Sequence, residues 1–156
     1  MKQIIYILFL LFASMPSMAA DYNVRDFGAK GDGTTLDSHA INDAISAAVT
    51  KGGGRVVLPT GTYLSGTIRM KSNIELHLEA GAILLATEDK LAYDKSEPFN
   101  FPEYQDGGHT YFHNSLIWAE GGQNISITGP GMIDGSGLTK KDTERAGNVQ
   151  GGSIGT

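Results

Sequence analysis

Two histidines and a tyrosine, His109, Tyr111 and His113, are the residues of this sequence whose types and spacing suggest a binding site. Histidines four residues apart lie on one face of a helix and can bind one metal ion. Here Gly107 and Gly108 directly precede them, and glycine disfavours a helix. No third ligand is placed to complete a zinc site. The sequence therefore predicts no metal site, and the three side chains are candidates for contact with an organic ligand.

The segment that carries these residues, 87–114, is longer than an ordinary connection between elements. Its aromatic residues are Tyr93, Phe99, Phe101, Tyr104, Tyr111 and Phe112. Connections of this length are commonly functional or disordered, and the aromatic density argues against disorder. Two interpretations stay open. The rings contact a ligand, or they pack the segment against the rest of the fold.

Other chemistries find little support in the residue patterns. No phosphate-binding Gly-Lys-Ser or Gly-Lys-Thr loop is present, and no helical pattern follows Gly129-x-Gly131, so a dinucleotide site is not supported. The 156 residues carry a formal net charge of −5 and no basic run, which argues against nucleic acid or an anionic membrane surface as partner. There is no cysteine, so disulfides are excluded. We expect no cofactor.

One helix is predicted, which begins at Asp37 and extends for about 14 residues. It is expected to position the elements that follow it. Asp37 is the predicted N-cap, and the glycines at 52–54 end the helix. Its apolar residues recur with the helical period: Leu36, Ala40, Ile41, Ala44, Ile45, Ala48 and Val49. This stripe predicts that the helix lies on an apolar surface.

After this helix the chain is a series of short apolar segments divided by Gly, Ser and Asn turns. The predicted strands are 55–58, 62–64, 67–70, 74–78, 82–85, 115–119, 125–127 and 132–133. An Asn followed by alternating apolar residues occurs at Asn73 and again 51 residues later at Asn124. Stacked coils of a solenoid produce such a repeat, and no Asn-Gly or Asp-Gly pair joins adjacent strands as a tight hairpin. The pattern favours a solenoid over hairpin meanders.

The first 19 residues have the features of an export signal. Lys2 is followed by an apolar run over 4–13, and Pro16 then precedes the small residues of a cleavage site. The run is too short to span a bilayer, which needs about 20 residues. We therefore expect residues 1–19 to be a signal peptide and residues 20–156 to form one domain. We also expect export to the periplasm or the extracellular space, with no membrane contact after cleavage.

Residues 22–33 read Tyr-Asn-Val-Arg-Asp-Phe-Gly-Ala-Lys-Gly-Asp-Gly, and this string resembles the opening of the pectate lyase-like superfamily. Further on, the pattern from Asn124 to Ile133-Asp134-Gly135-x-Gly137 resembles glycoside hydrolase family 28, which contains polygalacturonases and rhamnogalacturonan hydrolases. The resemblance covers most of residues 22–137. It implies an all-β fold, a right-handed parallel β-helix (solenoid) with an N-terminal capping α-helix, incomplete at its C-terminal end.

The resemblance implies a secreted, inverting hydrolase of pectic polysaccharide or oligosaccharide, using two carboxylates about 6.5–9.5 Å apart. Family members carry Asn-Thr-Asp, Asp-Asp and Gly-His-Gly, followed by Arg-x-Lys. The first three are missing here, and Arg69-Met70-Lys71 precedes the other motifs, so we interpret it as solvent-facing strand residues. We therefore expect no catalytic residue in this chain, catalytic residues downstream of Thr156, and no activity of the chain alone.

On such a fold, His109, Tyr111 and His113 are expected to reach substrate, since aromatic faces can stack on sugar rings. The aspartates of the opening motif, such as Asp32, are expected to bind turn and cap amides rather than to act in catalysis. The alternatives are a calcium-dependent polysaccharide lyase on the same fold and a non-catalytic β-helical protein of the carbohydrate-binding or tailspike type. The complete enzyme is expected to be a monomer.

Overall fold

Short parallel strands dominate the computed structural model, which describes residues 20–95 and 115–135. Sheet A contains β1 (Asp21–Asn23), β3 (Gly54–Leu58), β6 (Ile74–Leu78) and β9 (Ser126–Thr128). Sheet B contains β2 (Asp32–Leu36), β4 (Gly61–Ser65), β7 (Ala82–Ala86) and β10 (Met132–Asp134). Sheet C contains β5 (Ile68–Arg69) and β8 (Ile117–Trp118). Two short 3₁₀ helices, η1 (Val24–Phe27) and η2 (Lys90–Ala92), lie in the connections.

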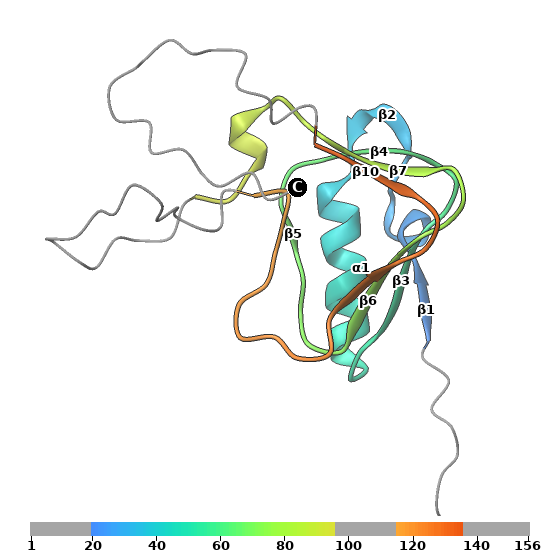
Figure 1. The fold of residues 1–156 in the computed structure, drawn as a ribbon, viewed down its shortest axis with the longest axis vertical. Coiled ribbons are helices and arrows are strands. Elements are labelled where there is room, and N and C mark those ends of the chain that lie inside the picture. Colours follow the sequence, from blue (N-terminus) through green and yellow to red (C-terminus); the bar gives the residue numbers. More distant parts are fainter. Residues whose placement is uncertain (1–19, 96–114, 136–156) are drawn as a thin grey trace, which may run out of the picture.

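The order of the strands along the chain makes the fold a solenoid. The chain passes from sheet A to sheet B to sheet C and then returns to sheet A one coil further on. Every described pair is parallel, for instance β3 with β6 and β4 with β7 (Figure 1). The expected right-handed parallel β-helix is therefore confirmed, and hairpins are absent among the described strands.

The core is a set of columns in which equivalent residues of successive coils lie on one another. In sheet A, Val56 pairs in register with Leu76, and Leu76 pairs with Ile127. In sheet B, Tyr63 pairs with Leu84. Successive residues of β6 and β7 alternate between buried and partly buried, because side chains of a strand point in turn to its two faces. The sequence therefore sends one apolar row per strand into the centre of the coil.

The N-terminal end of this core is covered by α1 (Ser38–Thr50). The helix packs against η1, β1, β3 and β5, and in the view of Figure 1 it lies across the outline of the coils. Its buried apolar face consists of Ala40, Ile41, Ala44, Ile45 and Ala48. The expected capping helix is thus present. With 13 residues it is too short to span a bilayer, and no helix of the described residues is long and apolar enough to do so.

Asp37 precedes α1 as expected, but its side chain does not cap the helix. It adopts helical dihedral angles, φ −94° and ψ −3°, whereas a side-chain N-cap needs the extended region. The buried carboxylate instead accepts hydrogen bonds from the backbone N–H groups of Lys30 (2.7 Å) and Gly31 (2.9 Å). Asp37 therefore fastens the opening motif to the start of the helix.

Asp32 organises the other turn of the opening motif. Its carboxylate accepts hydrogen bonds from the backbone N–H groups of Thr35 (2.7 Å) and Thr34 (2.9 Å), and from both hydroxyls. These bonds, the one from the Thr35 amide first, hold the pKa of Asp32 well below its ordinary value because they stabilise the charged form. The expected structural role of this aspartate is confirmed.

The repeat of Asn73 and Asn124 corresponds to a stacked pair of turns. Both residues adopt left-handed backbone, with φ 62° and 55°, a region in which Asn is tolerated better than most residues. The side-chain amide of Asn124 donates to the side-chain carbonyl of Asn73 at 2.9 Å. Each asparagine leads into a strand of sheet A, β6 and β9. The 51-residue spacing is therefore one coil of the solenoid, enlarged by the long segment after β7.

β9 and β10 form the last edge of sheets A and B in the part of the chain that the structure describes. Three of their apolar side chains are about half exposed: Ile127 (47%), Met132 (49%) and Ile133 (43%). The equivalents of Ile127 and Ile133 in the preceding coil, Leu76 and Leu84, are fully buried. Burial thus requires a neighbouring coil or helix on each side.

Replacing Asn124 will separate two contributions to stability, the side-chain hydrogen bond to Asn73 and the tolerance of left-handed backbone. We expect Asn124→Ala to lower the free energy of unfolding by about 2 kcal/mol, because it removes the side-chain hydrogen bond and strains a left-handed residue. Asn124→Gly loses the same hydrogen bond but accepts the backbone conformation, so its loss should be smaller. Urea unfolding of both variants measures the difference. A glycine variant less stable than the alanine variant would contradict the importance of the left-handed backbone.

Candidate functional site

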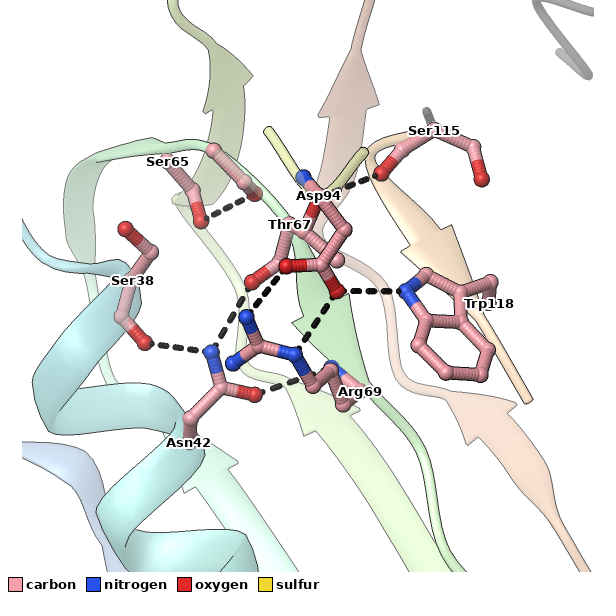
Figure 2. Close-up of polar contacts among 9 residues, drawn as sticks. Ser38, Asn42, Ser65, Thr67, Arg69, Asp94, Ser115 and Trp118 are labelled. Carbon is pink, nitrogen blue, oxygen red and sulfur yellow. Dashed lines mark hydrogen bonds and ion pairs between the residues drawn. The ribbon is translucent and has the colours of Figure 1, made fainter. Parts of the chain in front are cut away.

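The residues predicted to contact ligand, His109, Tyr111 and His113, lie outside the described residues, and so does everything beyond 135. No described residue therefore tests the predicted binding set. The described chain does include both flanks of the segment 96–114, which leaves near Asp94 and returns at Ser115. These flanks meet beside sheet C, and the contacts there form a cluster of polar side chains (Figure 2).

The hydroxyl of Thr67 binds both flanks of the segment. It accepts a hydrogen bond from the backbone N–H of Asp94 (2.9 Å) and donates one to the backbone carbonyl of Ser115 (3.0 Å). Thr67 is only 2% exposed, so these bonds are shielded from water. The preceding Gly66 allows the close approach, because a Cβ there would collide with the carbonyl of Ala92. One hydroxyl therefore holds the exit and the return of the segment together.

Asp94 is held by two side chains from sheet C. Arg69 forms a two-pronged ion pair with its carboxylate, with Nε at 2.7 Å from Oδ2 and Nη2 on Oδ1. The indole N–H of Trp118 donates to Oδ2 at 3.0 Å. The hydrogen bonding to Asp94 raises the pKa of Arg69 above its ordinary value. Such paired bonds fix direction as well as distance, so the indole and the guanidinium are both oriented.

Asn42 connects this cluster to the capping helix. Its side-chain amide donates to the carbonyls of Ser38 and Thr67, both at 2.8 Å, and its side-chain oxygen accepts from the backbone N–H of Arg69 at 2.8 Å. Figure 2 shows Asn42 projecting from α1 toward the strand that carries Arg69. The side chain therefore satisfies backbone groups of both elements, and α1 is tied directly to sheet C.

The Arg-x-Lys triplet was interpreted as solvent-facing strand residues, but only Arg69 lies in a strand, because β5 ends there. Arg69 and Lys71 are exposed, and Met70 between them is buried. The Lys71 ammonium lies 6.0 Å from the centroid of the Trp118 ring, within the range of a cation–π interaction. Two cations and one indole thus lie together: Arg69 and Trp118 are paired in sheet C, and Lys71 follows the end of β5. The carboxylate of Asp94 is bound to Arg69 and Trp118, so in this cluster it positions these two side chains.

A second polar cluster lies on the outer face of sheet A. The Thr128 hydroxyl is 2.5 Å from Glu75 Oε1 and 2.7 Å from His77 Nδ1. Because the hydroxyl has one proton and the ionised carboxylate only accepts, Thr128 donates to Glu75 and accepts from His77 Nδ1–H. These bonds join β6 to β9 and so connect consecutive coils. Among the described residues, no group of three or more His, Cys, Asp or Glu could hold a metal ion.

The sequence patterns did not identify Thr67, Asn42, Asp94 or Trp118 as members of a site. Their contacts join residues 24 to 48 positions apart, which no local pattern reports. The one available signal was that Trp118 is the single tryptophan of the chain.

Comparisons with known proteins agree with this architecture. The sequence model of a family described as rhamnogalacturonase A/epimerase, pectate lyase-like, matches residues 22–152. An exo-poly-alpha-D-galacturonosidase of Dickeya chrysanthemi is 35% identical over 129 residues, which are 74% of this chain and 19% of the relative.

Two solved structures are similar in fold and in sequence. A hyperthermoactive exopolygalacturonase from Thermotoga maritima superposes with a TM-score of 0.65 at 36% identity, covering 79% of this chain and 26% of the other. The family 28 exopolygalacturonase of Yersinia enterocolitica gives 0.61 at 40% identity, covering 79% and 22%. The chain thus spans about a fifth to a quarter of the length of these three proteins.

Removing the Thr67 hydroxyl should loosen the flanks of the segment. In Thr67→Val the N–H of Asp94 and the carbonyl of Ser115 lose their partner at a buried position, so the free energy of unfolding should fall by about 1–3 kcal/mol. Amide hydrogen exchange should accelerate at Asp94. Thr60→Val is the matched control, since the exposed Thr60 hydroxyl donates only to the carbonyl of Ala80. Equal exchange at Asp94 in both variants would contradict the role assigned to Thr67.

Proposed function

This chain belongs to the rhamnogalacturonase A/epimerase, pectate lyase-like family. We propose that it forms the scaffold and substrate-binding part of a pectin-degrading glycoside hydrolase of the polygalacturonase type. The resemblance to glycoside hydrolase family 28 is confirmed by the likeness to exopolygalacturonases, one of them of that family. The observation that carries the proposal is the 40% identity to the family 28 exopolygalacturonase over 79% of this chain. The substrate class that follows is a polymer of galacturonate.

The proposed chemistry is inverting hydrolysis by two carboxylates, with room for one water molecule between them. The 156 residues contain no Asn-Thr-Asp triplet, no Asp-Asp pair and no Gly-His-Gly. We therefore assign these residues to the scaffold and to the binding of substrate, and assign the acid and the base to residues beyond them. In this role α1 closes the end of the solenoid, and sheet C anchors the segment with His109, Tyr111 and His113.

The predicted export of the protein is consistent with the proposed polysaccharide substrate. Pectic polysaccharide is too large to enter a cell, so an enzyme that shortens it acts outside the cytoplasm. The signal-like residues 1–19 fit the expected export to the periplasm or the extracellular space. Calcium-assisted elimination would instead need a cluster of oxygen ligands for the ion. We favour hydrolysis because the similar proteins named above are polygalacturonases and an exo-poly-alpha-D-galacturonosidase.

The 156-residue polypeptide alone should release no reducing ends from polygalacturonate, because it lacks the catalytic motifs. A reducing-sugar assay tests this, with ultraviolet absorbance recorded in parallel to detect an unsaturated elimination product. A family 28 exopolygalacturonase is the positive control. Reducing ends from the isolated polypeptide would overturn the assignment of catalysis to residues beyond it, and an unsaturated product would favour the lyase.

In an active protein that contains this sequence, His109→Ala and Tyr111→Ala should raise the KM for oligogalacturonate, because both side chains are proposed to contact the sugar. Replacing one binding contact should weaken apparent affinity by about tenfold, equivalent to about 1.4 kcal/mol. His39→Ala is the control, since His39 is an exposed residue of α1. Unchanged KM and kcat in both variants would show that these side chains only pack the segment.

A further inference from the structure

Trp118 is a half-buried ring on the outer face of sheet C, and its orientation is set before any ligand arrives. Its indole N–H is bound to Asp94 at 3.0 Å, and Asp94 is itself held by the two-pronged pair with Arg69. Figure 2 shows the polar edge of the indole directed at Asp94. A ring held in this way loses little conformational freedom when it binds a ligand, which favours affinity.

Two cations lie near this ring in a protein whose formal net charge is −5: Lys71 lies over the ring, and Arg69 binds the same carboxylate as the indole N–H. The Lys71 ammonium lies 6.0 Å from the ring centroid, and Lys71 is exposed. The Arg69 side chain is 47% exposed although it is paired with Asp94. The carboxylate of Asp94 is matched by Arg69 and by the indole N–H, so its repulsion of an anion is reduced. The local surface is therefore aromatic and cationic on an otherwise acidic molecule.

The chemistry of a uronate fits this combination of groups. A pyranose ring presents a face of C–H groups that can stack on an indole, and a uronate adds one carboxylate at the rim of that ring. We propose that Trp118, Lys71 and Arg69 form a non-catalytic binding site for a galacturonate residue of a pectic chain, on the outer face of sheet C. The identity of the sugar rests on the proposed function, whereas the aromatic and cationic groups are those of the described structure.

In this site the sugar stacks on the Trp118 ring and its carboxylate binds the Lys71 ammonium. Arg69 adds positive potential and holds Asp94, which keeps the indole in place. A neutral hexose gains the stacking contact but no ion pair, so the site discriminates in favour of acidic sugars. The site lies beside Thr67, whose hydroxyl binds the backbone of Asp94 and of Ser115.

The single tryptophan makes a specific experiment possible. Trp118 fluorescence of the full chain is recorded during titration with a short oligogalacturonate and, separately, with a neutral galactan oligosaccharide of equal length. We expect a saturable change with the oligogalacturonate that weakens with added salt, and a much weaker response to the neutral sugar. Lys71→Met should raise the Kd for oligogalacturonate about three- to fivefold at low ionic strength, the size expected for loss of an exposed ion pair.

Lys30→Met is the matched control, because Lys30 is an exposed lysine of the turn between η1 and β2, and Figure 1 shows β2 and β5 on opposite sides of α1. It should leave the Kd unchanged. Calorimetric titration of Trp118→Ala, in which binding should be lost, provides a measurement that does not depend on fluorescence.

Three outcomes overturn the site: no binding of oligogalacturonate, equal binding of the neutral sugar, or binding that is insensitive to both Lys71→Met and Trp118→Ala. None of them decides the proposed function, which is judged by hydrolysis of polygalacturonate in the longer active protein. Uronate binding at Trp118 without hydrolysis by that protein would leave the site in place and reject the proposed function.

Discussion

The structure depends on one constraint, the in-register stacking of parallel coils. A strand of one coil forms its backbone hydrogen bonds with the equivalent strand of the next, so each residue lies beside its counterpart one coil away. Val56, Leu76 and Ile127 form such a column inside the solenoid. On the outside the same rule places Trp118 beside Arg69 and His77 beside Thr128. The same strand register therefore aligns the core residues inside the solenoid and the residues of the candidate site on its outside.

Stacking leaves the ends of a solenoid open, and α1 closes the first of them. Its alanines are small enough to let the helix approach the coil closely, and Ile41 and Ile45 fill the space between. Asn42 lies on this same helix and bonds to sheet C. The helix thus covers apolar surface and also steadies the strand that carries Arg69. The half-exposed Ile127 and Ile133 show the situation of side chains that have a coil on one side only.

The architecture could be predicted from the sequence where apolar residues alternate or where Asn marks a turn. The helix and the strands after it were expected within one or two residues of their bounds. The strand Asp32–Leu36 was missed, because its polar sequence lacks apolar alternation and its pairing with β4 is irregular. Asp37 is the N-cap residue as expected, but its side chain forms no cap hydrogen bond, because its backbone is already helical.

The polar cluster at Thr67 could not be foreseen, since its members meet only after a coil has closed. Asp94 reaches Arg69 across 25 residues, and Ser115 reaches Thr67 across 48. The proposed function rests on the resemblance to a family, whereas the spacing of individual residues indicated only a candidate binding set. The expected ligand-contacting residues, His109 among them, lie outside the described residues and stay predictions.

The attachment of both flanks to one buried hydroxyl has a consequence for how such proteins diversify. A connection whose two ends are joined at a common point can change in length without altering the coils above and below it. The entropic cost of closing a loop rises only slowly, by about 0.6 kcal/mol for each doubling of its length. Thr67 therefore holds the two flanks at a fixed separation whatever the length of the connection between them.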